Sequence, residues 1–239
     1  MLTTEGALLN GRLQYRQPAH GFRSGIEPVL LAAAVPAEAG HRVLEAGTGA
    51  GAALLCLLGR VPGADGLGVE QDASMAALAT TNAEANGLAR MRVINGDILS
   101  VPLADPFDHA MANPPYHPPG PMSPVPERER AKRDDGGLIR HWTLRLAGAL
   151  RVSGTLTLVL PAGSAPTAIE AMQAAGCGGL VLFPLWPKAG RDAKLVLLRG
   201  VRGSRTPFRL SGGLVLHEPD GQFTRSAQAI LREGGGLAL

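Results

Sequence analysis

The apolar run Val43-Leu44-Glu45-Ala46 closes on a glycine-rich loop, Gly47-Thr48-Gly49-Ala50-Gly51. The run is typical of a buried strand, and the residues that follow the loop, 52–59, are typical of a helix. Glycines between a first strand and a first helix let the backbone approach a ligand closely. The stretch therefore predicts the first strand–loop–helix unit of an α/β fold, with a ligand at its loop.

The same alternation continues to about residue 200. We expect strands at 42–46, 66–70, 91–95, 107–112, 155–160, 180–185 and 194–198, and helices at 52–59, 74–86, 138–150 and 166–175. Repeated units of this size predict a three-layer, doubly wound α/β fold, with a mostly parallel sheet between two layers of helices.

Both ends of the chain depart from this rhythm. Residues 1–20 are expected to be irregular or hairpin-like, and Ser24-Gly25-Ile26-Glu27 has capping-box spacing before a short helix at 29–35. Residues 214–224 are expected to form a hairpin, followed by a helix at 226–232. We predict one domain over residues 1–239, with an N-terminal cap at 1–40 and a C-terminal extension at 201–239.

The glycine spacing alone leaves two cofactors open. Gly47, Gly49 and Ala52 also satisfy the fingerprint for a nicotinamide dinucleotide, and Glu70, at the end of the second strand, can accept hydrogen bonds from ribose in either case. Glu45 favours a ligand with a cationic end, such as S-adenosylmethionine, over an anionic pyrophosphate. Asp97 adds a carboxylate that can accept from an adenine amino group.

Asn113-Pro114-Pro115-Tyr116 ends the strand predicted at 107–112. The amine of adenine is a poor nucleophile, because its lone pair is delocalised into the ring. Two acceptors, the side-chain oxygen of Asn113 and the carbonyl of Pro114, can draw that nitrogen toward a pyramidal geometry. Pro115 stiffens the backbone, and Tyr116 can stack on the base. The tetrapeptide predicts methyl transfer to a planar amine or amide nitrogen.

Composition sets further bounds. The chain has 239 residues, a hydrophobic content of 45% and a formal net charge of only +3. Cys56 and Cys177 lack His or Cys neighbours, so we expect buried thiols, no metal site and a reducing cytoplasm. The N-terminus does not have the pattern of a signal peptide, and no apolar run approaches the ~20 residues that cross a bilayer. Trp142 is expected in the core of its helix.

Together these motifs resemble those of class I methyltransferases. More narrowly, the chain resembles the bacterial tRNA methyltransferases that modify the 6-amino group of the adenine next to the anticodon in a valine tRNA. The resembling stretches are Gln17-Pro18, Gly21-Phe22-Arg23-Ser24, Val29-Leu30-Leu31-Ala32, the glycine loop with Glu45, Val69-Glu70, Asn95-Gly96-Asp97, the tetrapeptide, Arg128–Arg133 and Asp220-Gly221-Gln222-Phe223-Thr224. The family typically has Asp where this chain has Glu27.

The resemblance implies a Rossmann-like sheet of seven strands, the last antiparallel, and a segment 17–25 that folds over the cofactor. The expected cofactor is S-adenosylmethionine, and the expected partner is tRNA. The candidate cofactor residues are Arg23, Glu45, Gly47, Thr48, Gly49, Gly51, Glu70, Gln71, Asp97, Ile98 and Asn113. The candidate catalytic residues are Asn113, Pro114 and Tyr116, and the candidate substrate residues are Pro115, Tyr116, His117, Arg128, Arg130 and Arg133.

A second basic stretch, Lys188–Arg209, is expected to contact RNA and includes Arg199, Arg202 and Arg205. Two other functions stay open. A protein methyltransferase could act on a glutamine amide with the same tetrapeptide, although such enzymes usually carry a separate N-terminal helical domain. A non-catalytic adenosine-binding module is disfavoured by the intact Asn113 and Tyr116. We expect a monomer or a weak homodimer.

Overall fold

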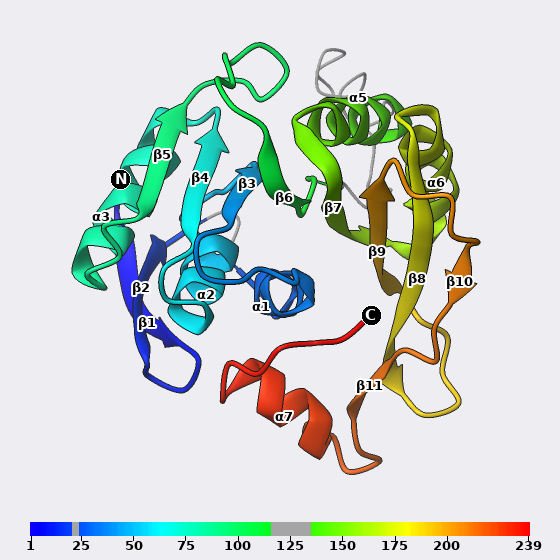
Figure 1. Cartoon of the computed structure of the whole chain (residues 1–239). Coiled ribbons are helices and arrows are strands. Elements are labelled where there is room, and N and C mark those ends of the chain that lie inside the picture. Colours follow the sequence, from blue (N-terminus) through cyan, green and yellow to red (C-terminus); the bar gives the residue numbers. More distant parts are fainter. Residues whose placement is uncertain (21–23, 116–134) are drawn as a thin grey trace, which may run out of the picture.

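The computed structural model describes residues 1–20, 24–115 and 135–239, and Figure 1 shows a central sheet with helices on both faces. The main strands are β3 (Arg42–Ala46), β4 (Asp65–Glu70), β5 (Met91–Asn95), β6 (Phe107–Ala112), β7 (Leu150–Pro161), β8 (Cys177–Lys188) and β9 (Leu195–Arg202). The helices are α1 (Glu27–Ala34), α2 (Ala52–Arg60), α3 (Ala73–Ala85), α5 (Asp135–Gly148), α6 (Ala165–Ala174) and α7 (Arg225–Leu231), with a 3-10 turn at Ala162–Ser164.

The sheet has the strand order β5-β4-β3-β6-β7-β9-β8. Neighbouring strands run parallel except at β9, which is antiparallel to both β7 and β8. The predicted three-layer α/β fold is confirmed: these seven main strands are mostly parallel and the last of them in the sequence is antiparallel, and two short strands described below extend the sheet. The order runs one way from β3 to β5 and the other way from β6 onward, which makes the gap between β3 and β6 a topological switch point.

Two hydrophobic cores cover the two faces of the sheet, because successive strand residues point to opposite sides. Val43 belongs to the core that includes α1, α2, α3 and α7, whereas Leu44 belongs to the core that includes α5 and α6. Both side chains are fully buried. A strand that is buried on both faces has a nearly continuous apolar sequence. This explains why the sequence pattern predicts β3.

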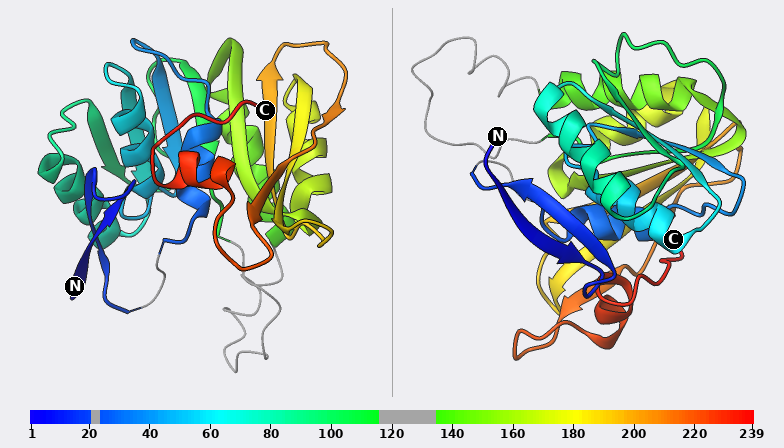
Figure 2. Two further views of the ribbon diagram at one scale, coloured as in Figure 1. Left: turned by 90° about the horizontal axis from the view of Figure 1, so that it is seen from below. Right: turned by 90° about the vertical axis from the view of Figure 1, so that its left-hand side faces the viewer.

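An antiparallel hairpin precedes the sheet, formed by β1 (Thr3–Leu8) and β2 (Leu13–Pro18). Figure 2 shows it at the edge of the molecule beside α3. Asn82 of α3 attaches it: the side chain accepts from the backbone N–H of Arg16 at 2.9 Å and donates to the carbonyls of Arg16 and Ala50 at 2.8 and 2.9 Å. The hairpin alternative for residues 1–20 is therefore confirmed.

One local prediction is wrong, and another is confirmed only in part. The expected capping box at residues 24–27 does not form, because α1 starts after Ile26 without a side-chain cap, and Ser24 instead hydrogen-bonds to the hydroxyl of Tyr15 at 2.7 Å. The expected hairpin at 214–224 is reduced to one bridge between His217 and Phe223. β11 (Leu214–His217) pairs in parallel with β8, as does the short β10 (Arg209–Leu210). The sheet therefore has nine strands.

The described part of the chain contains no helix that is long and apolar enough to cross a membrane.

Candidate active site

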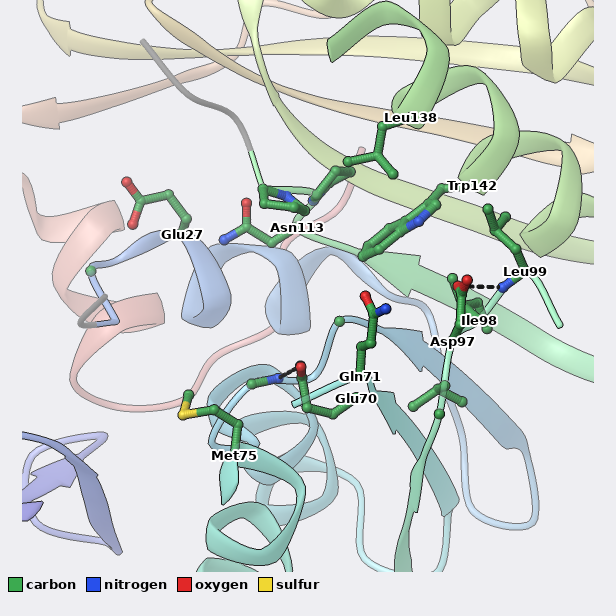
Figure 3. Close-up of a pocket in the computed structure, with 17 residues that line it drawn as sticks. Glu27, Glu70, Gln71, Met75, Asp97, Ile98, Leu99, Asn113, Leu138 and Trp142 are labelled. Atoms are coloured by element: carbon green, nitrogen blue, oxygen red, sulfur yellow. Dashed lines mark hydrogen bonds between the residues drawn. The ribbon is translucent and has the colours of Figure 1, made fainter. Parts of the chain in front are cut away.

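The carboxyl ends of four parallel strands open into one cavity of about 610 Å³ (Figure 3). Ala46, the last residue of β3, pairs with Ala112, the last residue of β6, so the glycine loop and Asn113 emerge side by side at the switch point. The lining residues are Gly25, Glu27, Gly47, Gly49, Val69, Glu70, Gln71, Met75, Gly96, Asp97, Ile98, Leu99, Asn113, Pro114, Pro115, Leu138 and Trp142. Ligands of doubly wound folds bind at this position.

The glycine loop has the backbone that its sequence predicts. Gly47 and Gly49 have φ angles of 65° and 55°, a region that favours glycine. The backbone N–H of Gly49 donates to Oε2 of Glu70 at 2.8 Å, which ties the loop to the end of β4. Gly51 does not line the cavity: it is the N-cap of α2, and a methyl group on it would lie 2.8 Å from Cε of Met91. Its φ angle of 90° is the reason that glycine is favoured at this position.

Glu45 lies behind this loop and is only 3% exposed. Its carboxyl accepts a hydrogen bond from the hydroxyl of Thr48 at 2.5 Å. Burial raises its pKa to about 8, because the charged form is poorly solvated there. Both residues line a second cavity of about 50 Å³, which shares Gly47, Gly49 and Asn113 with the main one. A ligand cation in this second cavity would favour the ionised carboxylate.

Two carboxylates stand at the ends of β4 and after β5. Glu70 also accepts from the backbone N–H of Asp72 at 2.9 Å, and Asp97 accepts from the N–H of Leu99 at 2.9 Å. Those backbone bonds fix each side chain, while a carboxylate has lone pairs enough for further donors. Gln71 and Ile98 are neighbours of the two acids and line the same cavity. The arrangement can accept hydrogen bonds from ribose hydroxyls and from an adenine amino group.

The side-chain oxygen of Asn113, Oδ1, indicates where a ligand binds in the site. This atom is buried, and within the described ranges no hydrogen-bond partner reaches it. Buried polar atoms are nearly always paired, so an orphaned acceptor at a cavity indicates a ligand donor. Pro114 and Pro115 continue the wall of the cavity after Asn113.

Several predicted site residues lie outside the described part of the chain. They are Arg23, Tyr116, His117, Arg128, Arg130 and Arg133. Their assignments stay predictions.

The sequence pattern does not identify all of the lining residues. It predicts Glu27 in a capping box and Trp142 in a helix core. Instead Glu27 lines the cavity, and Figure 3 shows it on the side of Asn113. Trp142 is half-buried and lies across the cavity from Glu27. The signal for Trp142 and Leu138 was their spacing of four residues, which places both on one face of α5.

The second basic stretch divides into two parts. Arg199 donates to the carbonyl of Leu239 at 3.0 Å, and Arg202 donates to the carbonyl of Ala147, so both guanidinium groups stabilise the fold. Three exposed cations, which we call the basic loop, lie at the other end of β8 and β9: Lys188, Arg191 and Lys194.

The basic loop is at the edge of the sheet that holds the cavity. Leu158 of β7 pairs with Ala112 of β6, Pro161 of β7 pairs with Leu195 of β9, and Leu195 pairs with Leu185 of β8. The carboxyl ends of β6, β7 and β8 therefore point the same way. Three strand spacings separate β6 from β8, roughly 14 Å.

Among the residues that the structure describes, no group of three or more His, Cys, Asp or Glu side chains could hold a metal ion.

Comparison with known proteins agrees with this geometry. A family described as a methyltransferase domain matches residues 43–126. A solved structure from Agrobacterium tumefaciens, described as a predicted O-methyltransferase, superposes with a TM-score of 0.75 at 25% identity and covers 89% of this chain and 99% of that one. The chain is a class I methyltransferase that depends on S-adenosylmethionine. The buried acceptors and the glycine loop of the cavity fit that cofactor.

The relatives of known activity fall into two groups. The tRNA1(Val) (adenine(37)-N6)-methyltransferase of Bacteroides thetaiotaomicron is 32% identical over 142 residues, 59% of this chain and 60% of that relative. Its namesake from Dickeya chrysanthemi is 29% identical over 241 residues, 95% of each chain. The release factor glutamine methyltransferase of Rhodospirillum rubrum is 34% identical over 182 residues, 72% of this chain. This chain spans 55% of that relative, so the similarity to it is partial.

Proposed function

We propose that the chain methylates the exocyclic 6-amino group of an adenine in tRNA, next to the anticodon, with S-adenosylmethionine as methyl donor. The observation that carries this proposal is the buried Oδ1 of Asn113 at the cavity of the switch point, which has no hydrogen-bond partner among the described residues. S-adenosylmethionine, when bound, supplies an electrophilic methyl group on its sulfonium. Every other requirement falls on residues of the chain.

The first requirement is to free the lone pair of the target nitrogen. Oδ1 of Asn113 and the carbonyl of Pro114 accept the two amino hydrogens, which draws the nitrogen toward a pyramidal geometry. Proline has no N–H that would compete for these acceptors, and it fixes the backbone. Tyr116 stacks on the base and holds it in line for displacement. No strong general base is needed.

The second requirement is to hold the cofactor. Glu70 would accept from the ribose hydroxyls, and Asp97 with its neighbour Ile98 would bind the adenine edge. The backbone of Gly47 and Gly49 would lie against the bound cofactor. Glu45 sits behind the loop, where the second cavity can admit the ammonium of the cofactor.

The third requirement is to attract RNA and to admit one base. An adenine in an anticodon loop can leave its stack at low cost. The exposed basic loop, at the same edge of the sheet as Asn113, suits the phosphate backbone. Further support comes from the tRNA methyltransferase of Dickeya chrysanthemi, which aligns with 95% of this chain.

The second candidate is methylation of a glutamine side-chain amide in a release factor. The same two acceptors can bind an amide nitrogen, and the relative from Rhodospirillum rubrum is 34% identical over 182 residues. The partial coverage of that relative, 55%, makes this candidate the weaker one.

Incubation with methyl-labelled S-adenosylmethionine separates the two. The protein is offered total tRNA or a release factor, and the products are digested and identified by mass spectrometry. The proposal predicts label in N6-methyladenosine. Label in a glutamine amide, with none in tRNA, would instead establish the second candidate.

A further inference from the structure

Trp142 has no part in the function proposed above, although its side chain reaches the cavity. It lies on α5 and is half-buried, with one side packed against the core beneath α5. The six-membered end of its indole lies against the glycine loop: a methyl group placed on Gly47 would lie 2.7 Å from Cη2 of Trp142. The ring therefore touches the first residue of that loop.

The inner face of α5 forms an apolar wall of the cavity. Leu138 and Trp142 are four residues apart and project from the same face. In Figure 3 Leu138 lies toward Asn113, whereas Trp142 lies toward Gln71 and Asp97. The tryptophan is thus on the side of the carboxylates at the ends of β4 and β5, away from the acceptor that faces the target nitrogen.

We propose that Trp142 is a binding residue for the adenosyl group of the cofactor. Carboxylates such as Glu70 and Asp97 can bind only the edges of a ribose and a purine, so the flat faces need apolar contacts. Trp142 is the one aromatic side chain among the described residues that line the cavity. Loss of an aromatic–base stack to alanine weakens binding by roughly 5- to 150-fold.

The first test measures affinity by calorimetry for S-adenosylmethionine and for two ligands that carry the adenosyl group without a sulfonium. In Trp142→Ala the Kd of S-adenosylhomocysteine and of 5′-methylthioadenosine should rise by the same factor, roughly 5- to 150-fold. Trp142→Phe should restore most of the affinity for both. Unchanged Kd values would mean that the ring only packs on Gly47. A loss confined to S-adenosylmethionine would mean that it contacts the sulfonium, and either result overturns the proposal.

The second test uses the fluorescence of the chain, which has only two tryptophans. Trp186 lies on β8, and its Nε1–H donates to the carbonyl of Gly212 at 3.0 Å. In Trp186→Phe, S-adenosylhomocysteine should still change the emission, with the wild-type Kd. In Trp142→Phe the change should vanish while calorimetry still detects binding. If the emission change is lost in Trp186→Phe and kept in Trp142→Phe, the proposal is overturned. Neither test contains RNA, so the outcome does not depend on which substrate the protein methylates.

Discussion

At the scale of single residues, the site combines two buried polar groups in opposite states. Among the residues that the structure describes, Oδ1 of Asn113 is an acceptor without a donor, whereas the carboxyl of Glu45 has donors but no cation is identified beside it. Burial penalises the charge on Glu45 until a cation arrives. Each group is therefore satisfied only when the cavity is filled, and each gives a prediction.

Glu45 should make the stability of the cofactor-free protein fall as the pH rises. Its pKa is about 8 in the folded protein and 4.5 in the ordinary exposed state, so between these values unfolding releases a proton. The free energy of unfolding then decreases with pH, by at most about 1.4 kcal/mol per unit. Urea unfolding at pH 5 to 8 checks this, with Glu45→Gln as the reference that lacks the titration. If the two proteins keep a constant difference in stability across this range, Glu45 does not titrate as described.

Asn113→Ala should lower kcat far more than it weakens cofactor binding. The Oδ1 atom acts on the target nitrogen, and removing one such acceptor typically costs on the order of 100- to 1,000-fold in rate. The measurement pairs methylation kinetics with calorimetry of S-adenosylhomocysteine. Glu70→Gln is the matched comparison, because it should weaken cofactor binding first. An Asn113 variant whose defect lies mainly in cofactor affinity would contradict the proposed role.

At the scale of elements, the attachment of the N-terminal hairpin to the sheet depends on α3. Asn82 is 1% exposed and bonds to the backbones of β2 and the glycine loop, whereas Asn86, one turn later, makes its bonds to Gln14 in a more exposed position. Ser24, bonded to Tyr15 of the hairpin, precedes Gly25 at the cavity. Tyr15 and Pro18 of the hairpin also line the second cavity, so the hairpin shapes that cavity as well as the fold.

Asn82→Ala should destabilise the protein by about 1–3 kcal/mol, because it leaves buried backbone groups unpaired. That corresponds to a fall in Tm of roughly 2–4 °C per kcal/mol for a chain of this size. Asn86→Ala should cost less, since water can replace its bonds to Gln14. Thermal unfolding of both variants provides the comparison. Equal losses would mean that the buried bonds of Asn82 are not special.

The sequence predicts strands β3, β5 and β6 to the residue, because runs such as Val43–Ala46 are bounded by glycines, Asn or Asp. It does not predict the parallel pairing of β10 and β11 with β8, which depends on contacts made across the edge of the sheet. The glycine loop and Asn113 were recognisable from local patterns. The position of Trp142 at the cavity was not recognisable, because an aromatic residue on an apolar helix face usually packs in the core. Only the structure shows that its ring lies against the glycine loop.

At the scale of the whole molecule, the positions of the charged side chains indicate more about RNA binding than the net charge does. The chain carries only +3, and Arg199 and Arg202 donate to backbone carbonyls within the fold, so their expected contact with RNA stays a prediction. Lys188, Arg191 and Lys194 are exposed at the edge that carries the cavity. Exposed Arg205 and Arg209 stand at the opposite end of β8, where Arg209 pairs with Val181.

Replacing Lys188, Arg191 and Lys194 with Gln should flatten the salt dependence of tRNA binding. Each phosphate contact contributes about 0.7 to 0.9 to the slope of log Kd against log salt. Arg205→Gln with Arg209→Gln is the control at the other end of the sheet, and affinity for S-adenosylhomocysteine should stay unchanged in both. Binding measured from low to moderate salt decides. If the control variant flattens the slope as much as the replacement of the basic loop does, the basic loop is not the surface that binds tRNA.

The most direct test of the central claim is mass spectrometry of the nucleosides of purified tRNA after reaction with labelled S-adenosylmethionine. The wild-type protein should place the label in N6-methyladenosine next to the anticodon, and Asn113→Ala, folded and able to bind the cofactor, should incorporate it roughly 100- to 1,000-fold more slowly. Label on another atom of the RNA, or labelling by Asn113→Ala at the wild-type rate, would contradict the claim that this side chain activates an adenine amine.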